Sequence, residues 1–296
     1  MSLETSETTE SSLAATRADA GDARAQPDAP HVLVRSEDSG VQLNLGDLWA
    51  YRELLYFLTL RDIKVRYKQT LMGVAWVIVQ PLATMILFTL VFNKVARLDS
   101  GAVSYPLFAY SGLLLWTFFS VSVTSGTNSL LSNTSLVTKV FFPRAFIPAA
   151  AVGAGLVDLG VGSVFLVPLA LIYGAHVTVG ILLLPVFLLL AVMLALACGM
   201  LAAALTVKYR DIRHALPFLL QLWMFASPVV YPLPASWRWL FDFNPMTGVV
   251  EGFRASLTGT GFDWRAVAFS AVFAAALLAA SFYVFRKLED TFADVI

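Results

Sequence analysis

The sequence contains very few of the residues from which most catalytic and metal sites are built. Its 296 residues include three histidines and a single cysteine, Cys198. One thiol cannot form an internal disulfide, and no Cys and His residues show metal-ligand spacing. The chain also lacks a GxxxxGK[ST] loop, an HExxH motif and a candidate Ser-His-Asp set, so it has no means of that kind to hydrolyse ATP. We therefore predict that it is not an enzyme and holds no cofactor or metal of its own.

Charged residues are scarce as well, at 14% against about 25% in soluble domains. Hydrophobic residues make up 58% and gather in long runs, whereas a membrane barrel would show short alternating segments. We predict an all-α polytopic membrane protein with six transmembrane helices. The predicted spans cover about 71–92, 105–131, 145–173, 179–207, 214–231 and 266–285.

Two segments precede the first span. Residues 1–40 are rich in Ser, Thr, Ala, Asp and Glu, a composition that predicts a disordered cytoplasmic tail. Residues 41–70 predict an amphipathic helix on the cytoplasmic membrane surface, ahead of the transmembrane domain at 71–296. Its apolar face, at helical spacing, consists of Tyr51, Leu54, Leu55 and Leu58. A basic ridge follows, formed by Arg61, Lys64 and Lys68.

Positive charges between the spans predict the orientation of the chain. Most Lys and Arg residues fall in the segments that lie on the N-terminal side of the membrane if there are six spans. Because cytoplasmic loops carry such an excess, we expect both termini in the cytoplasm.

Asp158 is the one acid in the middle of a predicted span. An ionisable residue at that depth is a functional candidate. Its small neighbours make a buried hydrogen bond to an adjacent helix an equally good interpretation, so both stay open. A proton or sodium relay needs several ionisable residues within the membrane, and one buried acid does not provide them. An ion-coupled carrier is therefore not supported.

Two connecting segments have unusual compositions. The inner segment 136–148, LVTKVFFPRAFIP, is basic and aromatic, which suits either a protein contact or an anchor at the membrane interface. The outer segment at about 233–262 is too apolar for a free loop and too broken by Pro and Gly to span. We predict a re-entrant helical hairpin there, with an interfacial cover as the alternative. Its named residues are Trp237 and Trp239 at the interface, Asn244 and Pro245 at a helix start, and Glu251 and Arg254 as an i,i+3 pair.

Five stretches resemble, in order, the permeases of type-2 ABC exporters of the polysaccharide branch, which include O-antigen and teichoic-acid exporters. The stretches are LWAYRELLYFLTLRDIKVRYKQTLMGVAWVIVQPL, VTKVFFPR, LVDL, VKYRDIRHALPFLLQLWMFASPVVYP and FNPMTGVVEGFR. The resemblance covers about Leu45 to Lys287.

This resemblance implies a homodimer in the bacterial inner membrane that docks two cytoplasmic ABC ATPase subunits, which hold the ATP and Mg²⁺. The substrate would be a lipid-linked polysaccharide such as O-antigen, capsule or teichoic acid, with no nucleic acid involved. By the resemblance, the docking residues would be Arg61, Lys64, Arg66, Tyr67, Lys139, Phe141, Phe142 and Arg144.

A channel for such a polymer needs aromatic faces that stack on sugars and groups that form weak hydrogen bonds. The candidates are Tyr110, Trp116, Phe118, Phe119, Ser122, Thr124, Asn128, Trp223 and Phe225. Each aromatic residue has core packing or lipid contact as its alternative. Two other functions stay open for the chain: export of a drug or lipid by the same fold, and a membrane scaffold that transports nothing.

Overall fold

The computed structural model describes residues 51–68, 73–95, 103–140, 142–173, 178–233 and 235–295, and every regular element in these ranges is helical. The predicted tail at 1–40, the start of the predicted surface helix and Phe141 lie outside the described residues. The α-helices are α3 (Arg52–Lys68), α4 (Gly73–Phe88), α5 (Tyr105–Ser132), α6 (Thr134–Lys139), α7 (Phe146–Ser163), α8 (Leu166–Ile172), α9 (Leu184–Lys208), α10 (Ile212–Phe225), α11 (Arg238–Phe241), α12 (Pro245–Thr258) and α13 (Trp264–Val295). A π-helix, η1 (Thr89–Val95), extends α4, and 3-10 turns η2 (Val179–Leu183) and η3 (Ala235–Trp237) precede α9 and α11.

Within the described residues, five helical stretches are long and apolar enough to cross a membrane. They are Ala75–Phe92, Tyr105–Ser132, Phe146–Ile172, Val179–Lys208 and Trp264–Glu289. Five of the six predicted spans are thus present as such helices, and the prediction of an all-helical, multi-pass membrane protein is confirmed.

The predicted span at 214–231 differs from the other five. It corresponds to α10, whose 14 residues extend about 21 Å, less than the roughly 30 Å of a hydrocarbon core. A run of turns follows α10 from 226 to 230. Pro228 accounts for the break, because proline disfavours helical backbone at the residue before it. A count of six spans is therefore not confirmed.

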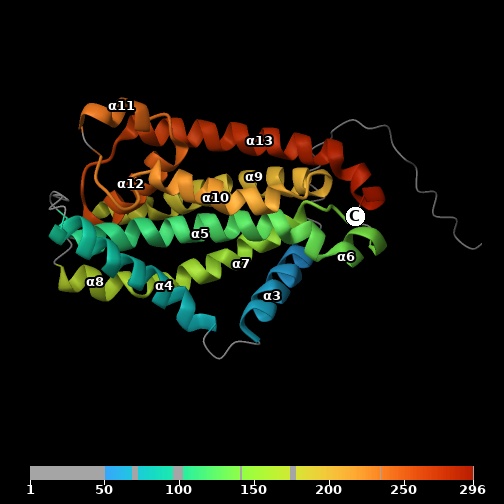
Figure 1. Ribbon diagram of the computed structural model, residues 1–296, viewed down its shortest axis with the longest axis horizontal. Coiled ribbons are helices and arrows are strands. Elements are labelled where there is room, and N and C mark those ends of the chain that lie inside the picture. Colours follow the sequence, from blue (N-terminus) through green and yellow to red (C-terminus); the bar gives the residue numbers. More distant parts are fainter. Residues whose placement is uncertain are drawn as a thin grey trace, which may run out of the picture. The chain divides into compact units, whose positions relative to one another are not determined.

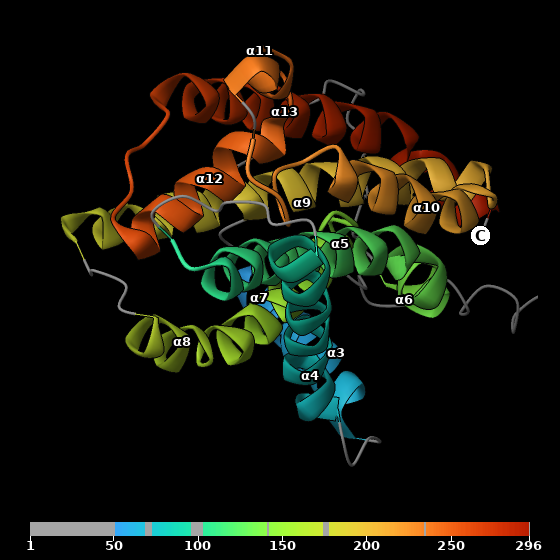
Figure 2. The same cartoon turned by 60° about the vertical axis from the view of Figure 1, so that its left-hand side comes forward.

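Helix α5 lies between two groups of helices (Figures 1 and 2). It packs against α9 on one side and α7 on the other, and α9 in turn packs against α13. Glycines permit the close approach of α5 and α9, since a Cβ on Gly126 would meet the Cα of Gly199 at 3.3 Å. Most of α5 is buried by these neighbours, so it forms the centre of the helical core.

The two ends of the helices differ in charge and structure. The C-terminal end of α13 lies beside α6 at one end, and α11 and α12 lie at the other (Figure 1). At the α6 end, the backbone N–H of Arg144 donates to Glu289 Oε1 at 2.9 Å, which ties the loop before α7 to α13. The predicted inner segment at 136–148 and the end of α13 thus lie at one end, and the predicted outer segment that contains α11 and α12 lies at the other.

Candidate functional site

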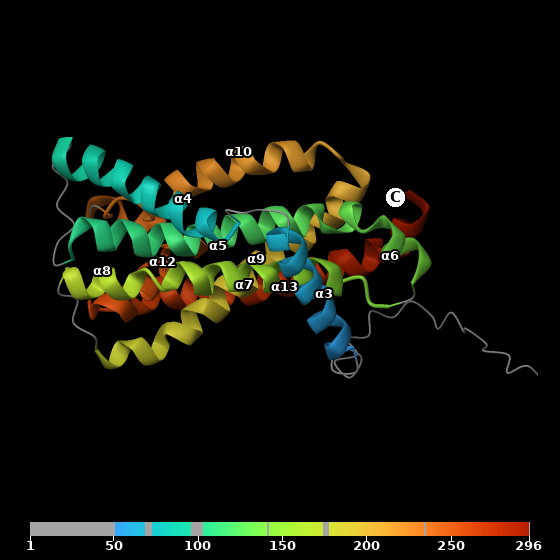
Figure 3. The ribbon, with the colours of Figure 1, turned by 90° about the horizontal axis from the view of Figure 1, so that it is seen from below.

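Helices α4 and α10 lie over one face of α5 (Figure 3), and a groove lies along that face. It consists of two clefts of about 250 Å³ each. The α10 cleft lies between α4, α5 and α10, and the α7 cleft lies between α4, α5 and α7, with Arg66 of α3 at its edge. The clefts share Gln80, Pro81, Thr117 and Val121, so we describe them together as the α5 groove.

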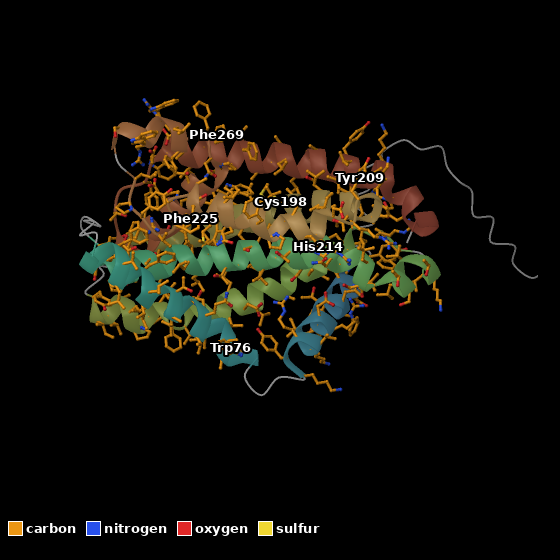
Figure 4. All side chains as sticks on the ribbon, in the orientation of Figure 1. Trp76, Cys198, Tyr209, His214, Phe225 and Phe269 are labelled. Carbon is orange, nitrogen blue, oxygen red and sulfur yellow. The ribbon has the colours of Figure 1, made fainter. Side chains whose placement is uncertain are left out.

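The chemistry of the groove is aromatic, apolar and polar without charge along most of its length. Trp116 and Phe118 of α5 border the clefts but are almost fully buried, at 5% and 3% exposed. Trp76, which is 59% exposed, supplies aromatic surface from the end of α4 nearest α3 (Figure 4). Neutral polar groups come from Gln80, Thr84, Thr117, Ser120 and Gln221. Among the described lining residues, Arg66 and Asp158 of the α7 cleft are the only charged ones.

Helical spacing explains which side chains of α5 reach the groove. Leu113, Trp116, Thr117, Ser120 and Val121 line the α10 cleft, and they recur every three or four residues, which places them on one face. Thr117, Gln80 and Gln221 were not among the predicted channel residues. Residue type alone does not show which face of a helix a side chain occupies, and the two glutamines are isolated amides within apolar runs.

Only some of the predicted channel residues border the groove. Trp116 and Phe118 line the groove. Tyr110, Phe119 and Ser122 lie on other faces of α5 and are fully buried within this chain. Tyr110, for example, donates to the carbonyl of Gly162 at 2.8 Å.

The other four predicted channel residues are absent from both cleft linings. Thr124 and Asn128 are half-buried, Trp223 packs edge-on against Phe119 at 5.2 Å, and Phe225 is exposed at the far end of α10 from His214 (Figure 4). A channel role for these four stays a prediction.

Three side chains in the polar run near the end of α5 form hydrogen bonds within that helix. Thr124 donates to the carbonyl of Ser120 at 2.8 Å, Thr127 to that of Val123 at 2.7 Å, and Asn128 to that of Thr124 at 2.9 Å. Such bonds to the preceding turn remove the need for other acceptors. These three side chains can therefore lie inside the membrane without channel water, and their polarity alone does not indicate a channel.

The predicted docking residues of α3 point in two directions. Lys64 is exposed, and Arg61 pairs with its neighbour Asp62 at 2.8 Å. Arg66 and Tyr67 instead point towards α7, where both donate to the carboxylate of Asp158. Of the two interpretations of Asp158, the hydrogen bond to an adjacent helix is the one present, and that helix is α3.

The pKa of Tyr67 reflects this position. Burial and the hydrogen bond to Asp158 raise the pKa of Tyr67 to about 12. Its phenol therefore stays protonated at neutral pH and remains a donor.

In the second predicted docking segment, two of the described residues contact other parts of this chain. Lys139 is exposed at the end of α6. Phe142 is buried in the cluster that holds Leu58 of α3, and the guanidinium of Arg144 donates to the carbonyl of Glu289. Phe142 is thus a packing residue here, because the chain turns it inward beneath α3.

The segment predicted as an outer hairpin contains α11 and α12, and one local prediction within it is confirmed. Asn244 is the N-cap of α12 and accepts from the backbone N–H of Met246 at 3.0 Å, and Pro245 opens the helix. The Asn244 amide also donates to the carbonyl of Ala226 at 2.8 Å, which holds the turn after α10. Trp237 and Trp239 are exposed, at 58% and 66%.

The predicted pairing of Glu251 with Arg254 is replaced by other contacts. Glu251 pairs with Arg238 at 3.0 Å, and Arg238 also pairs with Asp263 at 2.7 Å. Arg254 is buried and donates to the carbonyls of Pro228 and Val229. Local spacing permitted the i,i+3 pair, but the packing of α12 turns the two side chains to different partners.

The profile of the ABC-2 type transporter family matches residues 53–258. The chain belongs to the ABC-2 type transporter family. Its relatives include the O-antigen export system permease protein RfbA of Myxococcus xanthus, which is 30% identical over 256 residues, or 84% of this chain and 98% of that protein. RfbA of Klebsiella pneumoniae is 24% identical over 260 residues (86% and 98%), and the polysialic acid transport protein KpsM of Escherichia coli is 24% identical over 201 residues (66% and 77%).

The ABC-2 match confirms the resemblance seen in the sequence. It spans α3 to α12 and therefore includes the α5 groove and both predicted docking segments. This ABC-2 protein is a permease subunit, and its family normally works with an ATPase subunit.

Proposed function

We propose that this ABC-2 permease is the transmembrane subunit of an ATP-driven exporter that moves a lipid-linked polysaccharide outward across the bacterial inner membrane. The observation that carries the proposal is the α5 groove, with its tryptophans and its neutral amides and hydroxyls. The names of the relatives, O-antigen export permeases and a polysialic acid transport protein, support the same substrate class.

The groove suits a substrate that must slide. Aromatic side chains present faces for stacking on sugars, and amides such as Gln80 and Gln221 offer donors and acceptors to hydroxyl groups. Each neutral hydrogen bond contributes only about 1 kcal/mol. A long polysaccharide can therefore exchange one contact for the next without being held at one position.

The energy would come from partner subunits. The chain has no phosphate-binding loop, so ATP and Mg²⁺ belong on two cytoplasmic ATPase subunits. These would dock at the end of the helices that carries α6, with both termini on that side. In this proposal two copies of the chain form the channel, and α10 with the turn that follows it provides the sixth crossing.

The groove can be tested in vesicles that contain the chain, its ATPase and a lipid-linked polysaccharide. The variant Gln80→Leu/Gln221→Leu removes both amides at nearly constant volume, and we expect slower export with normal complex assembly. Phe218→Leu is the control, since Phe218 is exposed on α10 and absent from both cleft linings.

Comparison of substrates separates the alternatives. An exporter of drugs or lipids would move a small lipid regardless of an attached glycan, and a scaffold would move nothing. Export driven by an ion gradient without the ATPase would overturn the proposal.

A further inference from the structure

Helix α3 packs along α7, although it precedes α4 in the sequence (Figure 3). The ring of Tyr51 lies 6.4 Å from that of Phe146, at the start of both helices. Further along, Gly153 leaves room for Thr59, whose Cγ2 lies 3.1 Å from the position of a Cβ on that glycine. At the end of α3, Arg66 and Tyr67 reach Asp158. The contacts therefore follow one another in the same order along both helices, from the start of α3 to its end and from the start of α7 to Asp158.

The contact at Asp158 differs in kind from the others. It joins a carboxylate on an apolar helix to two donors that are adjacent on α3, and Arg66 also lies within 3.4 Å of Ser125 on α5. The side chains of Arg66 and Asp158 are only 28% and 14% exposed. Such a partly desolvated, charge-assisted contact is directional and stronger than a surface pair, so it ties the end of α3 to the middle of α7.

Movement of α7 would change the α5 groove. Gly155, Asp158 and Leu159 of α7 line one wall of the α7 cleft. A displacement of α3 that is carried across the Asp158 contact would shift this wall relative to α5.

We propose that Arg66, Tyr67 and Asp158 form a latch that passes a displacement of α3 to α7 and so couples ATP hydrolysis to the width of the α5 groove. The proposal rests on the proposed function, because it requires an ATPase that acts on α3. The three residues are positioning residues, which act through α7 and do not need to touch the substrate.

The test measures polysaccharide exported per ATP hydrolysed, with the chain and its ATPase reconstituted in vesicles. Asp158→Asn keeps the shape of the side chain but removes its charge. We expect this variant to assemble and hydrolyse ATP while export per ATP falls by about tenfold, within the usual range of coupling effects. Tyr67→Phe, which removes one donor and keeps the ion pair, should give a smaller loss. If Asp158→Asn does not assemble, Tyr67→Phe carries the same test.

Asp62→Asn is the matched control. Asp62 is a carboxylate on α3 that is 23% exposed and pairs with an arginine, Arg61, but that pair lies within α3. The amount of polysaccharide that the Asp62→Asn variant exports per ATP should equal that of the unaltered chain.

A covalent link separates transmission from a local effect of charge. The Cβ position on Gly153 lies 3.8 Å from Thr59 Cβ, within the range for a disulfide. In a Cys198→Ser background, Thr59→Cys and Gly153→Cys can therefore be oxidised to join α3 to α7. We expect this disulfide to restore export per ATP to Asp158→Asn, and a reductant to abolish the rescue.

The outcomes are distinct. Normal coupling in Asp158→Asn, or no rescue by the disulfide, would overturn the latch. If the unaltered complex hydrolyses ATP and exports no polysaccharide, the proposed function itself fails.

Discussion

Gly112 of α5 is a position where one added methyl group should destabilise the fold. A Cβ there would lie 2.3 Å from the carbonyl oxygen of Val229 and 2.7 Å from a guanidinium nitrogen of Arg254. Ordinary contacts of a Cβ begin near 3.4 Å. The backbone of the turn after α10 would have to move by about 1 Å to admit alanine.

The surroundings of Gly112 cannot yield easily. Arg254 donates to the carbonyl of Val229 at 3.0 Å and to that of Pro228 at 3.1 Å. Its guanidinium carbon lies 3.6 Å from the ring centroid of Phe108. These contacts supply donors to carbonyls that no helix satisfies, and at membrane depth such carbonyls need protein partners.

The expected cost of Gly112→Ala follows from three terms. Overpacking of a core costs about 1–3 kcal/mol, and weakening hydrogen bonds from a charged group costs about 1.5–3 kcal/mol. Alanine regains about 1 kcal/mol in a helix. The net loss in the free energy of unfolding should therefore be about 1.5–5 kcal/mol.

Unfolding of the purified chain in detergent measures this loss. Gly160→Ala in α7 is the control, because a Cβ there meets nothing within 4 Å, and it should be neutral or stabilising by up to about 1 kcal/mol. Equal stability of Gly112→Ala and the unaltered chain, or an equal loss in both variants, would refute the reasoning.

Three further predictions concern the two ends of the helices. Asn244→Ala removes a helix cap and a tether to the turn after α10, so the free energy of unfolding should fall by about 1–3 kcal/mol in the same assay. Lys139→Glu should weaken retention of the ATPase in pull-down without lowering stability, since Lys139 is exposed, whereas Arg144→Glu should lower both because its guanidinium bonds within the chain. Burial works to raise the pKa of Asp263, but hydrogen bonds and charge from Arg238 outweigh it and hold that pKa below its ordinary value. Asp263 therefore contributes stability above about pH 3.9 that is lost as the pH falls through its lowered pKa. Between pH 3.9 and that lowered pKa, the free energy of unfolding of Asp263→Asn should fall less on acidification than that of the unaltered chain.

The sequence by itself determined the local features of this protein. The length of an apolar run decides whether a helix can cross a membrane, so five spans were predictable within a few residues. The start of α12 was also predictable from the sequence. Capping by Asn244 and the preference of Pro245 for the first turn depend only on adjacent residues. The family was also recognisable, since its motifs are short and follow one another in order.

Tertiary structure decided which side chains meet. Arg66 and Asp158 are 92 residues apart, and nothing in the spacing of either helix indicates that α3 packs on α7. Arg254 could pair with Glu251 by helical spacing, yet it bonds to the carbonyls after α10. Hydrophobic patterning shows that a helix is buried but not which neighbour covers each of its faces. Those contacts depend on the shapes of several helices packed together, and they alone decide that Trp116 borders the groove whereas Phe119 does not.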